Sequence, residues 1–133
     1  MRIAWFTPYS RKSAIARFST AVVREIARRE TVDLWYPLTS DLLSNEVRRI
    51  CFESAAKLEP QDLAAYDLLV YNLGNYVPFH REIYEVSQRY PGICVLHDFV
   101  MHHFFAAYYL EQLRRPEAYV AAMRRRAGAQ GAE

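Results

Sequence analysis

A histidine and an aspartate adjoin at the end of a short apolar run, and these two side chains are the first candidates for chemistry. The run is Ile93–Leu96 and the pair is His97 and Asp98. An imidazole exchanges protons near neutral pH, and a neighbouring carboxylate can orient a partner or cap a helix. A strand without polar alternation is typical of a parallel sheet covered on both faces, so Cys94 is expected to be a buried thiol. The pair is therefore expected at the carboxyl end of a parallel strand, where ligands bind.

Two further histidines, His102 and His103, follow closely and raise the question of a metal site. Asp98 and His102 would share a helix face, because they are separated by four positions. A metal site needs three or four ligands, and no second cluster in the sequence supplies the others. The sequence therefore predicts no metal. Asp98 is instead expected to cap a helix over 99–113, with at least one of the two later histidines packed or on the surface.

Alternating apolar runs and helical patterns predict the elements that must position His97. Strands are expected over 3–7, 32–36, 49–52, 67–73 and 93–96, and helices over 15–26, 41–47, 60–63, 78–89, 99–113 and 117–126. Such a series predicts an α/β fold with a Rossmann-like, doubly wound parallel sheet. The domain is expected to span 1–126, with 127–133 as a tail or truncated linker.

This topology would gather three polar clusters at one edge of the sheet: the loop 8–14, the turn 72–76 and the His97–Asp98 pair. The loop lacks the G-x-G-x-x-G fingerprint of dinucleotide sites, and Ala14 stands where glycine would suit best. Ser13 is expected to cap the following helix, whose first amides could also bind phosphate or sugar oxygens.

Composition excludes several classes of protein. With 133 residues, 52% of them hydrophobic and 24% charged, the chain is expected to form one globular domain. A net charge of +2 gives no reason to expect nucleic acid as a partner. The two cysteines lack metal or redox spacing, and no apolar run suits a signal peptide or a membrane span. We therefore expect a cytoplasmic protein, either free or peripheral to the inner membrane.

The expected helix over 99–113 is apolar nearly all round. Such a helix must be buried on more than one side. It could lie between the sheet and the last helix, or it could be covered by a second domain, by a twin subunit in a homodimer, or by a membrane.

Three blocks of the chain together resemble the amino-terminal domain of bacterial family 4 glycosyltransferases of the GT-B fold. They are Arg2–Pro8 with Ser13–Ser19, Tyr71–Asn75 with Pro78–His80 and Ile83–Glu85, and Tyr90–Gly92 with Leu96–His103. The resemblance covers positions 1–126. It implies the retaining transfer of a sugar from a nucleotide-sugar donor to an acceptor hydroxyl, without a metal or other cofactor. The acceptor would be a sugar or a lipid-linked molecule, bound in a cleft between two Rossmann-like domains.

The resemblance also implies roles for particular residues. His97 matches a histidine that reaches the transferred sugar, where it would hydrogen bond a hydroxyl or charge that develops in the transition state. The loop that approaches the donor phosphates matches Ser13 and Ala14. The substrate-binding positions that remain are Gly74, Asn75, His80 and Asp98.

The chain departs from the family pattern in two places that bear on function. Many relatives have glycine where this chain has Ala14, and the carboxyl-terminal domain that grips the nucleotide has no counterpart here. The chain is therefore expected to be half of an enzyme, with a donor-binding domain as its partner. Two alternatives stay open: a stand-alone, non-catalytic binding or assembly module, and an unrelated small α/β enzyme that handles phosphate with His97 as a base.

Overall fold

Five parallel strands form the centre of this protein, whose computed structural model describes residues 1–37 and 47–128. The elements in chain order are β1 (Arg2–Phe6), α1 (Ala14–Ile26), β2 (Thr31–Pro37), β3 (Arg48–Phe52), η1 (Ala55–Lys57), α2 (Pro60–Leu63), β4 (Leu68–Leu73), α3 (Val77–Arg89), β5 (Ile93–Leu96), α4 (His102–Ala106), η2 (Ala107–Gln112) and α5 (Pro116–Ala127). The strands lie in the order β3-β2-β1-β4-β5, and every neighbouring pair is parallel. The expected Rossmann-like α/β fold is confirmed. The helix expected over 41–47 falls, apart from its last residue, outside the described residues.

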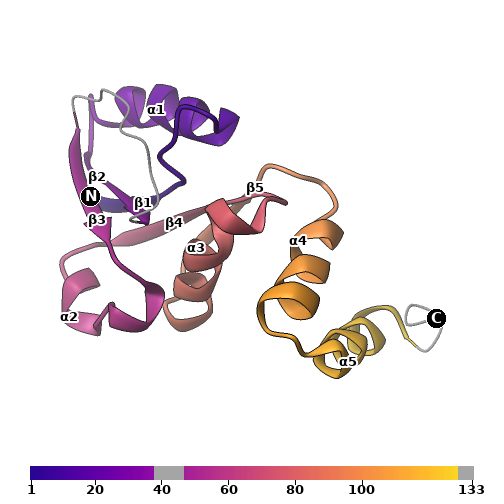
Figure 1. The fold of residues 1–133 in the computed structure, drawn as a ribbon. Coiled ribbons are helices and arrows are strands. Elements are labelled where there is room, and N and C mark those ends of the chain that lie inside the picture. The colour runs from indigo at the N-terminus through magenta and orange to yellow at the C-terminus, as the bar shows by residue number, and fades with distance from the viewer. Residues whose placement is uncertain (38–46, 129–133) are drawn as a thin grey trace.

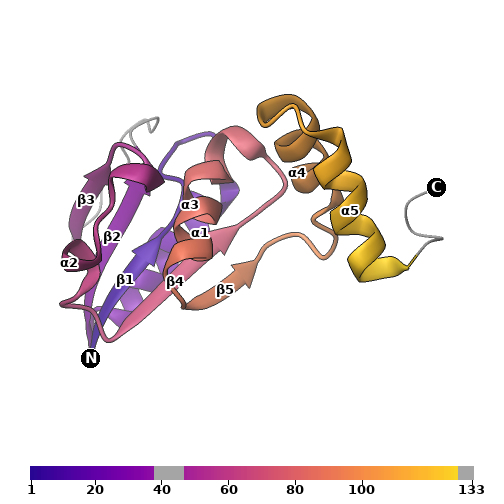
Figure 2. The same cartoon turned by 90° about the horizontal axis from the view of Figure 1, so that it is seen from below.

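The two faces of the sheet are covered by different helices, with α1 on one side and α2 and α3 on the other (Figures 1 and 2). Alternation along β1 sets this division, because successive side chains of a strand point to opposite faces. Ile3 and Trp5 belong to the core beside α1, whereas Ala4 and Phe6 belong to the core beside α3. Phe6 stacks on Trp35 with ring centroids 5.5 Å apart.

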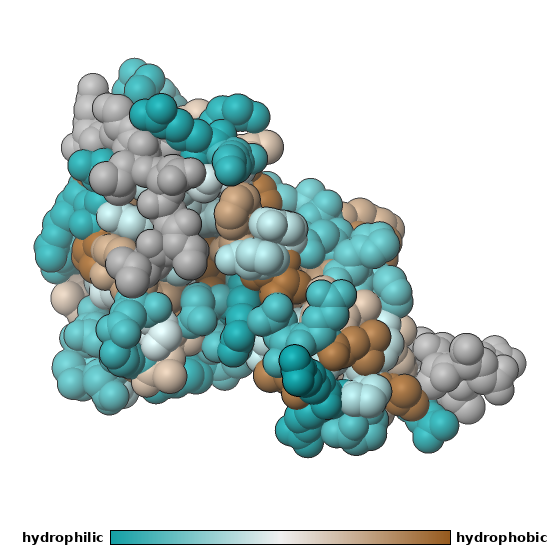
Figure 3. Space-filling model, in the orientation of Figure 1, coloured by the Kyte–Doolittle hydropathy of each residue, from teal (hydrophilic) through white to brown (hydrophobic). Residues whose placement is uncertain are grey.

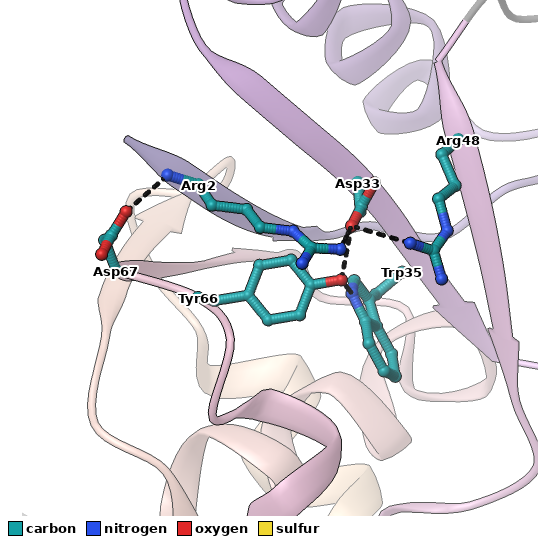
Figure 4. Close-up of polar contacts among 6 residues, drawn as sticks. All are labelled: Arg2, Asp33, Trp35, Arg48, Tyr66 and Asp67. Carbon is teal, nitrogen blue, oxygen red and sulfur yellow. Dashed lines mark hydrogen bonds and ion pairs between the residues drawn. The ribbon is translucent and has the colours of Figure 1, made fainter.

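A buried carboxylate lies near the amino ends of the strands, away from the edge expected to bind ligands (Figure 4). Asp33 is only 2% exposed, and its Oδ2 accepts hydrogen bonds from Arg2 Nη2 at 2.9 Å and Tyr66 Oη at 2.6 Å. Tyr66 Oη in turn accepts from Trp35 Nε1 at 3.0 Å. Burial raises the pKa of Tyr66, and the bond to Asp33 acts in the same direction. Loss of either hydrogen-bond donor would leave the buried Asp33 carboxylate incompletely paired, which is strongly destabilising. The network therefore holds β1 and β2 to the segment before β4.

The last strand differs from the expectation of an apolar strand covered on both faces. Ile93 and Leu96 are 52% and 56% exposed, and Cys94 is an exposed free thiol. The reason is topological: among the described residues β5 pairs only with β4, and the chain after it leaves the sheet instead of crossing back over it (Figure 2). The prediction that Cys94 is buried was therefore wrong.

Beyond β5, the helices α4, η2 and α5 form an arm that projects from the sheet (Figures 1 and 2). The arm packs on α3 through Tyr84, whose ring contacts those of Phe104, Phe105 and Tyr108. Within α4 and the π-helical η2 only Phe104 is buried. Apolar surface accordingly shows on the arm and in the middle of the face drawn in Figure 3.

The helix expected over 99–113 begins later than expected, at His102, and changes from α- to π-helical at Ala107. Phe99 and Val100 belong to the connection after β5 and are exposed. The helix contacts α3 and α5, and apart from Phe104 its side chains are half-buried or exposed, so it is not enclosed all round.

Candidate functional site

A crevice of about 770 Å³ opens at the carboxyl edge of the sheet, where β1, β4 and β5 end. Its lining comes from the start of α1, from the turn after β4 and the first turn of α3, and from the end of β5. The lining residues are Lys12, Ser13, Ala14, Ile15, Phe18, Asn75, Tyr76, Phe79, His80, His97 and Asp98. The structure thus brings together the three polar clusters that the parallel topology was expected to gather.

One wall of the crevice is the amino terminus of α1. Ser13 caps this helix as expected, because its Oγ accepts the Ala16 amide at 3.2 Å. The described residues offer no acceptor for the amides of Ala14 and Ile15. These amides carry the positive end of the helix dipole, and Lys12 beside them is exposed. This wall can therefore donate hydrogen bonds to an anionic or oxygen-rich group.

The opposite wall holds two histidines that share one partner, Asn72, which is fully buried near the end of β4. His97 Nε2 lies 3.0 Å from Asn72 Oδ1, and His80 Nδ1 lies 3.1 Å from the Asn72 backbone oxygen. The Asn72 amide nitrogen donates to the Phe6 carbonyl at 2.9 Å, which ties this wall to the end of β1.

Burial shifts both imidazoles towards the neutral form. Burial lowers the pKa of His97, although the Asp98 carboxylate opposes the shift. Burial lowers the pKa of His80 further, to about 4, against a smaller raising effect of its bond to Asn72. A neutral imidazole has one N–H and one lone pair, so each ring can accept a hydrogen bond or a proton.

Asp98 does not cap the long helix, contrary to the expectation from its position. Its Oδ2 accepts the Asn75 amide at 2.7 Å, whereas α4 begins after Met101, which makes no side-chain cap bond. Asn75 caps α4 from outside instead, because its Oδ1 accepts the Phe104 amide at 3.1 Å. Its Nδ2 donates to the Val100 carbonyl at 2.8 Å. Asn75 and Asp98 thereby hold the turn after β4 against the connection after β5.

Gly74 lies directly behind the crevice and is buried. A Cβ built on it would stand 2.8 Å from Ile15 Cδ1, 3.1 Å from His80 Nε2 and 3.2 Å from Asp98 Oδ2. A methyl here would displace the end of the Ile15 side chain and shift His80 and Asp98 by a few tenths of an ångström. The absence of a side chain at Gly74 thus lets the groups of both walls approach closely.

Several residues around the crevice were not singled out from the sequence, among them Asn72, Phe18 and Lys12. Asn72 reads as one polar residue in an apolar strand, and Phe18 reads as part of the apolar face of a helix. In the structure Phe18 is 42% exposed, and its ring meets that of His97 edge-on at 4.8 Å. Lys12 had no local signal beyond its place before the helix.

His102 and His103 are exposed on α4 and do not line this crevice. Within residues 1–37 and 47–128, no group of three or more His, Cys, Asp or Glu side chains is arranged to hold a metal ion. None of the helices in that part of the chain is both long and apolar enough to cross a membrane.

No protein family, curated protein or solved structure matches this chain. The fold and the crevice therefore carry the functional argument.

Proposed function

We propose that this chain is the amino-terminal, acceptor-binding half of a retaining, nucleotide-sugar-dependent glycosyltransferase. The observation that carries the proposal is the crevice in which His97, His80 and Asp98 face the start of α1. In such an enzyme a second domain would close over this edge of the sheet and bring the nucleotide. His97 would contact the sugar that is transferred.

The two walls of the crevice have complementary chemistry that suits this role. The start of α1, with Lys12, supplies hydrogen-bond donors for a phosphate-bearing group. The wall of His97, His80 and Asp98 supplies acceptors for hydroxyl groups. A molecule with hydroxyls at one end and phosphate at the other can satisfy both walls together.

Binding and turnover test the proposal separately. In a titration of the ¹⁵N-labelled chain with nucleotide sugars, free nucleotides and sugar acceptors, we expect amide shifts at Ser13–Ile15 and at His97. We expect no sugar transfer by the chain alone, because in the proposed enzyme most of the groups that hold the nucleotide would belong to the second domain. Transfer should appear when a donor-binding domain is supplied.

Three outcomes would contradict the proposal. Sugar transfer by the isolated chain would show that no second half is needed, and hydrolysis of a phosphate ester would favour an independent α/β enzyme. Shifts confined to surfaces away from the crevice, with any of these ligands, would favour a non-catalytic binding module.

A further inference from the structure

The orientation of the Asn72 side-chain amide follows from its neighbour, the Phe6 carbonyl, which can only accept a hydrogen bond. A backbone carbonyl has no proton to donate, so the Asn72 atom beside the Phe6 oxygen, at 2.9 Å, must be the Nδ2 amide. The other side-chain atom, Oδ1, therefore faces His97 Nε2 at 3.0 Å. Because an amide oxygen also only accepts, His97 must carry its proton on Nε2.

The same argument gives the opposite result for His80. Its Nδ1 lies 3.1 Å from the backbone oxygen of Asn72, which again can only accept. His80 must therefore carry its proton on Nδ1, and its Nε2 has the lone pair. One residue thus contacts both rings, through its side chain in one case and its backbone in the other.

We propose that Asn72 is a positioning residue that holds the two crevice histidines in opposite tautomers, so that His97 Nδ1 and His80 Nε2 are both hydrogen-bond acceptors. The assignment of the tautomers is independent of the proposed function, and only the choice of a sugar as the ligand rests on it. A ligand group that contacts either nitrogen must donate, as a sugar hydroxyl does and a fully ionised phosphate does not. Of the hydrogen bonds that the free Nδ1 of His97 could make, acceptance from a hydroxyl fits this geometry, and donation to negative charge does not.

The tautomers can be read from the protein without any ligand. In long-range ¹H–¹⁵N correlation spectra at pH 7.5, protonated and lone-pair ring nitrogens resonate far apart. We expect Nε2 of His97 and Nδ1 of His80 to be of the protonated kind, and the other nitrogen of each ring to be of the lone-pair kind. His97→Gln and His80→Gln assign the signals, and the exposed His103 provides an internal comparison.

The variant Asn72→Ala separates the two contacts. It should release His97 into a mixture of exchanging tautomers and leave His80 fixed, because His80 is bound to a backbone oxygen that the variant keeps. Asn72→Asp retains an acceptor oxygen and should keep the His97 proton on Nε2. The matched control is Tyr66→Phe, which removes the two part-buried hydrogen bonds of Tyr66 Oη in the network around Asp33 and should leave both histidine patterns unchanged.

The wild-type spectrum decides the proposal even if Asn72→Ala does not fold. A His97 proton on Nδ1, a His80 proton on Nε2, or averaged signals for either ring would overturn it. So would a folded Asn72→Ala protein in which His97 keeps the wild-type pattern. A failure to bind nucleotide sugars would count against the proposed function alone and would leave these tautomers as measured.

Discussion

His80 bears on both ligand binding and stability, because it lines the crevice and is buried, with only 2% of the residue exposed. Its pKa falls from 6.5 to about 4 on burial. Between these values the unfolded chain binds more protons than the folded one, so the free energy of unfolding rises with pH. The stabilisation is complete above pH 6.5 and is lost as the pH falls towards 4.

We expect the free energy of unfolding to drop by roughly 2 kcal/mol between pH 7 and pH 5 from His80 alone. The lowered pKa of His97 adds to the drop with the same sign. Urea unfolding at the two pH values measures the change. In His80→Gln the difference should shrink, and an unchanged difference would show that His80 is not the group responsible.

Gly74→Ala tests the close approach behind the crevice. The new methyl would meet Ile15 Cδ1 at 2.8 Å and His80 Nε2 at 3.1 Å, so the end of the Ile15 side chain must turn away and the His80 ring must shift. We expect a loss of about 1–3 kcal/mol in the free energy of unfolding, together with shifted His80 ring signals. Gly128→Ala is a control for a glycine with open space around it, although its φ of 72° brings some strain. Wild-type stability and unchanged His80 signals in Gly74→Ala would contradict the prediction.

At the scale of the elements, the Asn75 side chain holds the connection from β5 to α4 through two hydrogen bonds. Asn75→Ala removes the acceptor of the Phe104 amide and the donor to the Val100 carbonyl. We expect a loss of about 1–2 kcal/mol, since such caps contribute on that order. Hydrogen exchange at the Phe104 amide should become at least tenfold faster.

Gln112→Ala is the matched control, because it removes an exposed amide contact to Arg81 from the same arm. It should leave exchange at Phe104 unchanged. Equal acceleration in both variants would show that the arm opens as a whole, and that Asn75 has no special role in holding it.

The sheet was predictable from the sequence, because apolar runs and helical spacing are local signals. The meeting of the three polar clusters was predictable too, because parallel strands all end at the same edge of a sheet. The sequence could not predict how β5 is covered. The four apolar residues Ile93–Leu96 would look the same in a buried central strand and in an exposed edge strand. Nor could it place Asp98, whose partner Asn75 lies on another connection. The role of Asn72 was hidden for the same reason, since both histidines that it contacts come from other elements.

For the molecule as a whole, the open side of β5 predicts self-association. Leu96, Phe99 and Val100 are all more than half exposed, and β5 has no second neighbour in the described sheet. Burial of such surface is favourable by roughly 25 cal/mol per Å² before the costs of association. We expect sedimentation at micromolar concentration to show dimers.

Phe99→Ser should shift that equilibrium to the monomer, because it removes the most exposed of these side chains. Leu110→Ser, at another exposed apolar position on η2, serves as the control and should leave the dimer intact. A wild-type chain that sediments as a monomer would contradict the prediction.

The place of β1 in the middle of the sheet has a consequence for the nascent chain. Ile3 pairs with Val32 on one side and with Leu68 on the other. Synthesis proceeds from the amino terminus at about 5–20 residues per second, so roughly two to six seconds separate the addition of Pro37 from that of Leu68. During that interval one edge of β1 has no strand to pair with, although its side chains are almost all apolar. Slow translation of 38–68 would prolong this exposure, and it is there that the protein should depend most on chaperones that bind unpaired strands.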